Sequence, residues 1–294
     1  MREREITKVM TGFKEYTKRD IKKLDEVSLR GLLHERIHHN IEVPLYTLLR
    51  KWSGKPIAGF GMQAQVVFDV WQEKLYPEDD PDIQWCKRYL EIATQVRDGK
   101  NPDVNEPLPE PFTEEEMKVV HKLLWGRCSV RDWIDRPVTD EMIEKILEAG
   151  RAAPIGCNLD EVRFIVLKTP EEKKMCWSDI STENAVIIVI GYDKRPSHVV
   201  GQDLPEAVPQ NMGFDCAAAG DHMLLMAHAL GLGGCWLSKR DDTDKRFKEQ
   251  WGLHDENIEI AMHLAIGWSA IVPIKSARAP LEYYIIRKDS RSVS

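Results

Sequence analysis

The residues best suited to chemistry lie together in the segment Arg127-Cys128-Ser129-Val130-Arg131. In an extended chain alternate side chains project from the same face, so Arg127, Ser129 and Arg131 would place two guanidiniums around one hydroxyl. Arginine binds phosphate through a rigid fork of N–H donors. Taken alone, the segment predicts either a site for a phosphorylated, hydroxyl-bearing ligand or, equally well, a surface strand with ion pairs.

Three other segments could complete such a site. Residues 152–158, AAPIGCN, form a small-residue loop after a predicted helix, and their backbone can approach a flat ligand closely. Residues 231–236, GLGGCW, turn from a predicted helix into a predicted strand. Lys275 and Arg278 add two cations late in the chain. Together these segments favour a bound ligand over an ordinary surface strand.

A second candidate is the sequence His34-Glu35-Arg36-Ile37-His38, which has the HExxH spacing of zinc proteases. Two histidines four residues apart share one helical face and could bind a metal, with Glu35 as the base. The alternative is a solvated, charged helix face that contains histidines by chance. Arg36 inside the motif and the lack of an HxxGxxH continuation favour this alternative, so no metal site is predicted.

Residues 59–64, GFGMQA, match the GxGxxA turn that binds dinucleotides. That turn requires a buried strand directly before it, so that a helix N-terminus points at the pyrophosphate. The preceding residues, KWSGKPIAG, contain one proline and two glycines and make a poor strand. A loop that enters a helix is the better interpretation.

The composition of the 294-residue chain excludes several classes of protein. It has 41 basic and 48 acidic side chains, a net charge of −7, and neither residues 1–112 nor residues 113–294 carry a basic excess. Nucleic-acid binding, which needs a strongly basic surface, is therefore not expected. With 43% apolar and 30% charged residues the chain can build a globular core, and no apolar run is long enough to cross a membrane.

The six cysteines are scattered and form no CxxC pair, which argues against a zinc ribbon or a thioredoxin-like redox pair. The first residues, MREREITK, lack the apolar stretch of a secretory signal. Reduced thiols without an export signal predict a cytoplasmic protein.

A proline-rich segment, residues 100–113, divides the chain. It contains four prolines and is the best linker candidate, because proline blocks helix formation. Thr113 and Glu116 have the spacing of a capping box, so a helix should follow directly. We therefore expect a helical N-terminal extension over residues 1–112 and a second domain over residues 113–294.

Apolar spacing predicts the elements on both sides of this boundary. Helical periodicity occurs in three segments of the extension, LDEVSLRGLLHERIHHNI, QAQVVFDVWQEKLY and IQWCKRYLEIATQV. The second domain alternates predicted helices, MIEKILEAGRAA and FDCAAAGDHMLLMAHALGLG, with predicted strands, VRFIVLK, AVIIVIGYD, GGCWLS, IEIAMHLAIGW and LEYYIIRK. This alternation indicates an α+β fold.

Five blocks occur in the order seen in flavin-dependent nitroreductases: RCSVRDW (127–133), RAAPIGCN (151–158), DCAAAGDHMLLMAHALGLGGCW (215–236), IGW (266–268) and KSARAPL (275–281). On these blocks the chain resembles that family over about residues 120–288, whereas residues 1–112 have no counterpart in the family core. The resemblance implies a mixed β-sheet flanked by helices and an intertwined homodimer with FMN at each of two interface sites. LEYYIIRK could be the C-terminal strand that crosses to the partner.

The resemblance also implies roles for single residues. Arg127 should contact the FMN phosphate, Ser129 the ribityl chain, and Arg131 the N1/C2 carbonyl edge of the isoalloxazine. A cation at that edge raises the flavin's potential, because reduction places negative charge there. The flavin carries the chemistry, so no catalytic side chain is predicted. The other cofactor-binding residues that the resemblance implies are Cys128, Pro154, Ile155, Gly156, Asn158, Asp215, Leu237, Ser238, Lys275 and Arg278.

The leading hypothesis is therefore an FMN-dependent oxidoreductase. It would pass two electrons from a reduced donor, NAD(P)H, through flavin N5 to a small organic acceptor in a ping-pong cycle. One alternative is a non-catalytic flavin-binding sensor or storage protein, because the N-terminal extension and an unusual segment at residues 160–162 could close the acceptor pocket. Another is a zinc hydrolase that uses His34, Glu35 and His38.

Two roles are open for the N-terminal extension. It could pack against the dimer and cover apolar surface. It could instead form a substrate lid or a docking surface for an electron-transfer partner, with Trp52 or Trp71 near the flavin.

Overall fold

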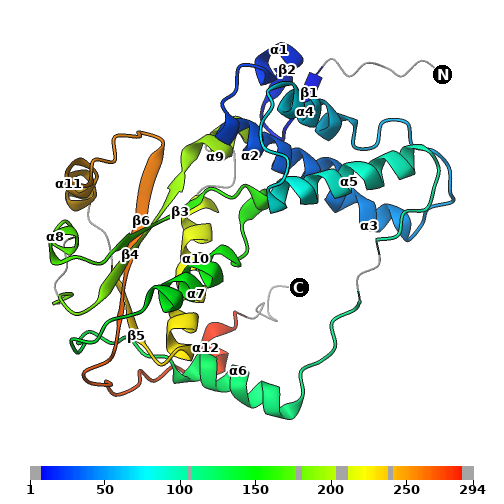
Figure 1. The fold of residues 1–294 in the computed structure, drawn as a ribbon. Helices are drawn as coiled ribbons and strands as arrows, with labels where there is room; N and C mark the ends of the chain where they lie inside the picture. Colours follow the sequence, from blue (N-terminus) through cyan, green and yellow to red (C-terminus); the bar gives the residue numbers. More distant parts are fainter. Residues whose placement is uncertain (1–7, 105–106, 177–180, 203–210, 238–240, 287–294) are drawn as a thin grey trace, which may run out of the picture.

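The computed structural model describes residues 8–104, 107–176, 181–202, 211–237 and 241–286 (Figure 1). Its N-terminal part begins with a hairpin of two strands, β1 (Lys8–Met10) and β2 (Glu15–Thr17). The helices that follow are α1 (Lys18–Ile21), α2 (Glu26–Ile37), α3 (Val43–Leu49), α4 (Met62–Glu73) and α5 (Pro81–Arg97). A π-helix, η1 (His38–Glu42), joins α2 to α3. The three helices predicted for this part are confirmed.

The C-terminal part begins with α6 (Glu114–Gly126), and the predicted capping box of Thr113 and Glu116 is present. The elements that follow, in chain order, are α7 (Asp140–Arg151), η2 (a 3-10 turn, Gly156–Asn158), β3 (Val162–Leu167), α8 (Pro170–Lys173), β4 (Val186–Asp193), α9 (Lys194–Val200), α10 (Asn211–Ala229), β5 (Gly233–Leu237), α11 (Asp241–Trp251), β6 (Ile258–Gly267) and α12 (Leu281–Tyr284). The α+β fold and four of the five predicted strands are confirmed.

Four strands form the main sheet in the order β3-β4-β6-β5, with each neighbouring pair antiparallel. Helices cover both faces, with α7 and α10 on one side and α8 and α11 on the other (Figure 1). Successive side chains of the buried strand β4 point to opposite faces of the sheet, so this strand contributes residues to two apolar cores. Ile187 and Val189 pack on the side of Phe247 from α11, whereas Ile188 and Ile190 pack on the side of α10.

The N-terminal helices do not build a core from their own residues alone. Their apolar cluster also includes Leu159, Val199 and Val200 from the C-terminal part. The close approach of α2 to α9 needs a glycine, because a Cβ on Gly31 would lie 2.7 Å from the Cα of Pro196. Trp71 is fully buried in this cluster, which identifies it as a packing residue.

One predicted strand is wrong. The first half of LEYYIIRK forms the short helix α12, and its last two residues lie outside the described part of the chain. Its apolar side chains are exposed, with Tyr283 82% accessible. Apolar and aromatic residues favour a strand only where another strand can accept their backbone hydrogen bonds, and no such partner lies beside this segment in the described structure.

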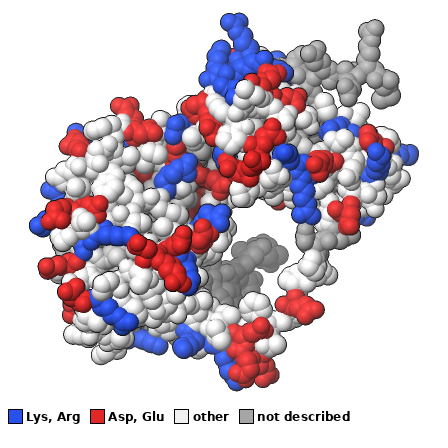
Figure 2. Space-filling view, viewed as in Figure 1, with Lys and Arg blue, Asp and Glu red and all other residues white. Residues whose placement is uncertain are grey.

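Three further expectations concern the GxGxxA match at residues 59–64, membrane-spanning helices and a basic surface for nucleic acid. Gly61 caps α4 in the left-handed conformation after a loop, so the GxGxxA match is a loop that enters a helix. Among the described helices, none is both long and apolar enough to cross a lipid bilayer. Figure 2 shows basic and acidic side chains interspersed over the visible face, without a continuous basic surface.

Candidate functional site

The segment after α6 is extended, as its alternation predicts, and it runs beside the edge strand β5. Arg127 ends α6 with extended dihedral angles, φ −65° and ψ 137°. Ser129 forms a parallel bridge with Gly234 of β5, and the Val130 N–H donates to the Gly234 carbonyl at 3.1 Å. This bridge adds a parallel pairing to the antiparallel sheet. Val130 and Trp133 are buried and anchor the segment, which leaves its polar residues at the surface.

Glycine at the start of β5 permits this arrangement. A Cβ on Gly233 would lie 2.2 Å from the Ser269 Oγ and 2.6 Å from a Val130 methyl group. The indole N–H of Trp133 also donates to the Gly233 carbonyl at 3.0 Å. The glycines that the sequence marks between helix and strand therefore bring the segment 127–133 against β5.

The two arginines of this segment are not neutralised. Arg127 is half-buried and Arg131 is exposed, and neither forms an ion pair with any described residue. Burial raises the pKa of the Cys235 thiol in β5, and the guanidiniums of Arg131 and Arg127 act in the opposite direction. The positive charges of Arg127 and Arg131 therefore both act on the Cys235 thiol. The alternative of a surface strand with ion pairs finds no support in the described structure.

The loop after α7 is held from inside the protein. The Gly156 N–H donates to Oδ2 of Asp215, a buried carboxylate of α10, at 3.1 Å. Cys157 and Asn158 follow with left-handed φ angles of 51° and 59°, which are uncommon for residues with a side chain. Asp215 thus fixes the backbone of a predicted cofactor loop. Pro154 and Asn158 are exposed, and Ile155 is half-buried.

A buried carboxyl group beside this loop was missed by the sequence analysis. Glu161 is fully buried, and no described N–H or O–H group donates to its side-chain oxygens, so its polar neighbour is the carboxyl group of Asp215. Burial raises the pKa of Glu161 to about 8, and the neighbouring Asp215 raises it further. Nothing in its spacing marks it, because its environment comes from α10, which lies more than fifty residues away in the sequence.

The other predicted cofactor residues are only partly brought together. Cys128 is half-buried and packs against the core on the α11 side of the sheet. Leu237 ends β5 half-buried, and Ser238 lies outside the described residues. Lys275 and Arg278 are exposed in the irregular segment between β6 and α12. No described interaction links these two cations to Arg127 or Arg131, and they are not among the charges that act on Cys235.

The HExxH sequence does not form the zinc-protease arrangement. Both ring nitrogens of the buried His34 are engaged, Nδ1 with the Asn158 carbonyl at 2.6 Å and Nε2 with Asp82 at 2.9 Å. The Glu35 carboxylate accepts two hydrogen bonds from Arg36. His38 instead lies close to His39 and Cys157. The zinc-hydrolase alternative requires His34 and His38 to share one metal, and these two residues are not grouped together in the described structure.

Comparisons with known proteins identify the C-terminal part. The sequence profile of the nitroreductase family matches residues 124–188 and 175–268. A protein of Archaeoglobus fulgidus, provisionally named NADH dehydrogenase/NAD(P)H nitroreductase, is 32% identical over 160 residues, which cover 52% of this chain and 86% of the relative. The chain belongs to the nitroreductase family. As a member of this family it is an oxidoreductase.

A second relative supports this assignment, and one solved structure shares the fold. A relative of the same provisional name from Methanothermobacter thermautotrophicus is 30% identical over 159 residues, covering 52% of this chain and 71% of the relative. Nitroreductase A from Vibrio parahaemolyticus shares the fold, with a TM-score of 0.50 and 22% identity over 59% of this chain and 77% of its own. The family profile begins at residue 124, so the N-terminal helices lie outside it.

Proposed function

We propose that this nitroreductase binds FMN and passes two electrons from NAD(P)H to a small organic acceptor. The observation that carries the proposal is the pair of Arg127 and Arg131, two guanidiniums that both act on the Cys235 thiol and have no carboxylate partner among the described residues. Two uncompensated cations beside the hydroxyl of Ser129 fit a ligand with a phosphate and a polyol chain. FMN has both groups.

Each of these residues has a defined task in the proposal. Arg127 binds the phosphate, and Ser129 contacts the ribityl chain. Arg131 places positive charge at the N1/C2 edge of the ring, where reduction adds negative charge. When bound, FMN supplies the two-electron chemistry at N5, and the protein supplies binding and orientation. The remaining contacts come from the 154–156 loop, the end of β5 at Leu237 and Ser238, and the cations Lys275 and Arg278.

The proposed assembly is a homodimer. The helix α6 has no buried residue, and in Figures 1 and 2 its N-terminal half and the linker before it stand away from the rest of the chain. Exposed apolar surface of this extent is typical of an interaction site. Large apolar side chains on α6 and in the C-terminal segment are at least 45% accessible: Met117, Val119, Leu124, Trp125, Ile271, Val272, Ile274, Leu281, Tyr283, Tyr284, Ile285 and Ile286. A second copy of the chain would cover them.

We also propose that the protein is cytoplasmic and that it divides into two parts near residue 112. All six cysteines are free thiols, which fits a reducing cytoplasm. The boundary near residue 112 separates the helical extension from the family domain, which begins shortly after it. The extension packs on that domain through α2 and α9, which supports a covering role.

A visible spectrum of the purified protein tests the function directly. We expect flavin absorption, bleaching by NADH or NADPH without oxygen, and rapid recovery of the colour on addition of a quinone or nitroaromatic acceptor. A protein that neither shows the flavin band nor binds added FMN would refute the proposal. Bound flavin that NAD(P)H reduces but acceptors fail to reoxidise would instead favour the sensor or storage alternative.

The phosphate role of Arg127 can be isolated by comparing two ligands. FMN and riboflavin differ only in the phosphate, so Arg127→Ala should weaken FMN binding about 10- to 100-fold and leave riboflavin affinity nearly unchanged. Fluorescence titration measures both dissociation constants. Arg151→Ala is the matched control, because Arg151 is an exposed arginine that pairs with Glu148. Equal losses for both ligands in Arg127→Ala would contradict the assignment.

A further inference from the structure

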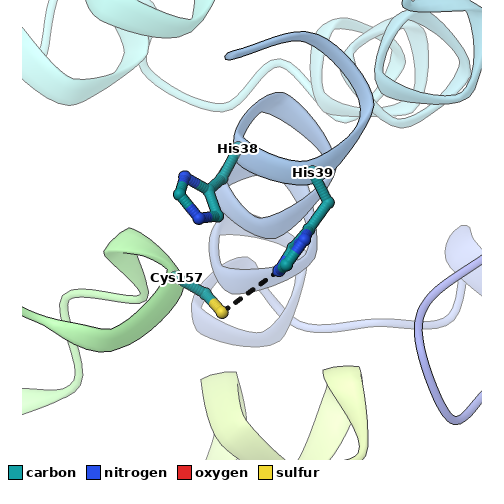
Figure 3. Close-up of side chains that lie close together, drawn as sticks. All are labelled: His38, His39 and Cys157. Atoms are coloured by element: carbon teal, nitrogen blue, oxygen red, sulfur yellow. Dashed lines mark hydrogen bonds between the residues drawn. The ribbon is translucent and has the colours of Figure 1, made fainter. Parts of the chain in front are cut away.

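We propose that His38, His39 and Cys157 form a zinc-binding site that joins the N-terminal extension to the loop after α7. One ligand atom from each of these residues lies within 4.8 Å of the other two. Figure 3 shows both imidazoles and the sulfur converging on one space between the π-helix η1 and the turn η2. The site uses none of the residues assigned to FMN phosphate binding, and it does not depend on the proposed function.

The distances suit a tetrahedral zinc ion. Zinc bonds sulfur at about 2.3 Å and imidazole nitrogen at about 2.0 to 2.1 Å, so the two ligand atoms should lie roughly 3.6 Å apart. The observed distance between His39 Nε2 and Cys157 Sγ is 3.3 Å. The His38 nitrogen lies within 4.8 Å of both of these atoms, so a side-chain rotation would bring it to the same ion.

The groups behind the ligands are arranged as they are around bound metals. The Nδ1 of His38 is 2.7 Å from the Glu42 carboxylate, which leaves Nε2 as the free nitrogen, and Figure 3 shows one ring nitrogen facing the sulfur. A carboxylate that fixes the other nitrogen of a histidine is a common partner of zinc ligands. Gln202 Nε2 donates to the Cys157 sulfur at 3.0 Å, which holds the sulfur in place.

Two local departures from regular backbone bring the ligands together. In an α-helix successive side chains point well apart, whereas the wider π-helix reduces the angle between His38 and His39. Their ring centroids lie 4.8 Å apart. Cys157 has a left-handed φ of 51° inside the turn η2, and its sulfur points toward η1. Backbone strain of this kind concentrates at functional sites.

The ligand chemistry selects the metal. A thiolate with two imidazoles suits zinc, whereas magnesium and calcium prefer oxygen ligands. His39 and Cys157 also line a cavity of about 470 Å³ together with Glu35 and Arg36. Since Glu35 is already paired with Arg36, the fourth position is open to water or a small ligand from this cavity.

A second cluster nearby does not compete as a metal site. His34, Asp82 and Asp160 also lie close together. The His34 nitrogens and the Asp82 carboxylate are occupied, because Arg30 donates two hydrogen bonds to Asp82 and His34 bonds Asp82 and the Asn158 carbonyl. A metal ion at this cluster would have to displace these hydrogen bonds.

Zinc binding by the full-length protein tests the site. The protein is freed of metal with a chelator and titrated with Zn²⁺ alone against a competing indicator, and bound zinc is counted by elemental analysis. We expect one zinc per chain, and a loss of at least about tenfold in affinity for Cys157→Ser, His39→Gln and Glu42→Gln. His254→Gln, at an exposed histidine outside the cluster, should bind zinc like the wild type.

Cobalt gives a readout that a merely structural variant cannot imitate. Co²⁺ added in place of Zn²⁺ should produce a thiolate charge-transfer band in the difference spectrum, and Cys157→Ser should lack this band while its circular dichroism matches the wild type. The proposal is overturned if the wild type binds zinc in less than stoichiometric amounts. It is equally overturned if Cys157→Ser binds zinc as tightly as the wild type.

Discussion

At the scale of single residues, the most unusual group is the Glu161 carboxyl. It is fully buried and no described group donates a hydrogen bond to it. Burial raises its pKa from 4.5 to about 8, and a hydrogen bond between the Glu161 and Asp215 carboxyl groups adds to the shift. Between these two pH values the folded chain holds a proton that the unfolded chain has released. The free energy of unfolding therefore falls as the pH rises through this window. Asp215 remains the acceptor for the Gly156 N–H, so the neutral Glu161 also avoids a second negative charge beside the loop.

Replacing Glu161 by glutamine removes this dependence. Glutamine resembles the protonated acid, so Glu161→Gln should leave stability nearly unchanged at pH 4, where the carboxyl group is largely protonated in both the folded and the unfolded chain. At pH 9 the variant should be more stable than the wild type by on the order of several kcal/mol, since each unit of pKa shift corresponds to about 1.4 kcal/mol. Urea denaturation at both pH values measures the difference. Glu171→Gln, at an exposed carboxylate, is the control, and an equal effect of Glu161→Gln at both pH values would contradict the prediction.

At the scale of elements, residue spacing predicted most of the helices and strands, but it did not predict which of them pair with each other. The alternation in RCSVRDW predicted an extended segment, and the glycines of GGCW predicted a turn from helix to strand. The structure adds what neither pattern predicted, the pairing of the two through the Val130–Gly234 hydrogen bond. LEYYIIRK has strand-like residues as well, but a strand also needs a partner, which its composition does not reveal. The Glu161–Asp215 contact and the His38–Cys157 cluster join distant segments, so no sequence pattern could show them.

The contact between the segment 127–133 and β5 depends on one missing side chain. In Gly233→Ala the new methyl group would collide with the Ser269 hydroxyl and with Val130. We expect a loss of about 1 to 3 kcal/mol in stability and weaker FMN binding, because Arg127 and Arg131 are carried by the displaced segment. Thermal unfolding and flavin titration measure the two effects. Gly213→Ala is the control, since nothing lies near its Cβ and alanine favours the helix; equal behaviour of the two variants would refute the argument.

At the scale of the whole molecule, the extension and the family domain are joined by shared packing. Leu159, Val199 and Val200 are buried in the cluster formed by the N-terminal helices. The sequence predicted these helices but not their location, because amphipathic periodicity shows which face is buried and not what covers it. A hydrogen bond between His34 of α2 and the Asn158 carbonyl also links the extension to the family domain. This placement favours a covering role for the extension over a detachable lid.

Removing residues 1–112 distinguishes a covering role of the N-terminal extension from a role as a substrate lid. Each exposed Leu or Val side chain costs about 1.5 to 3 kcal/mol, so uncovering Leu159, Val199 and Val200 should lower the thermal midpoint sharply or cause aggregation. The milder variant Gly31→Ala should weaken the same contact, because its Cβ would lie 2.7 Å from Pro196. Calorimetry and light scattering measure stability, and turnover with several acceptors measures specificity. A soluble truncated protein with an unchanged midpoint and altered acceptor preference would contradict the covering role and identify the extension as a lid.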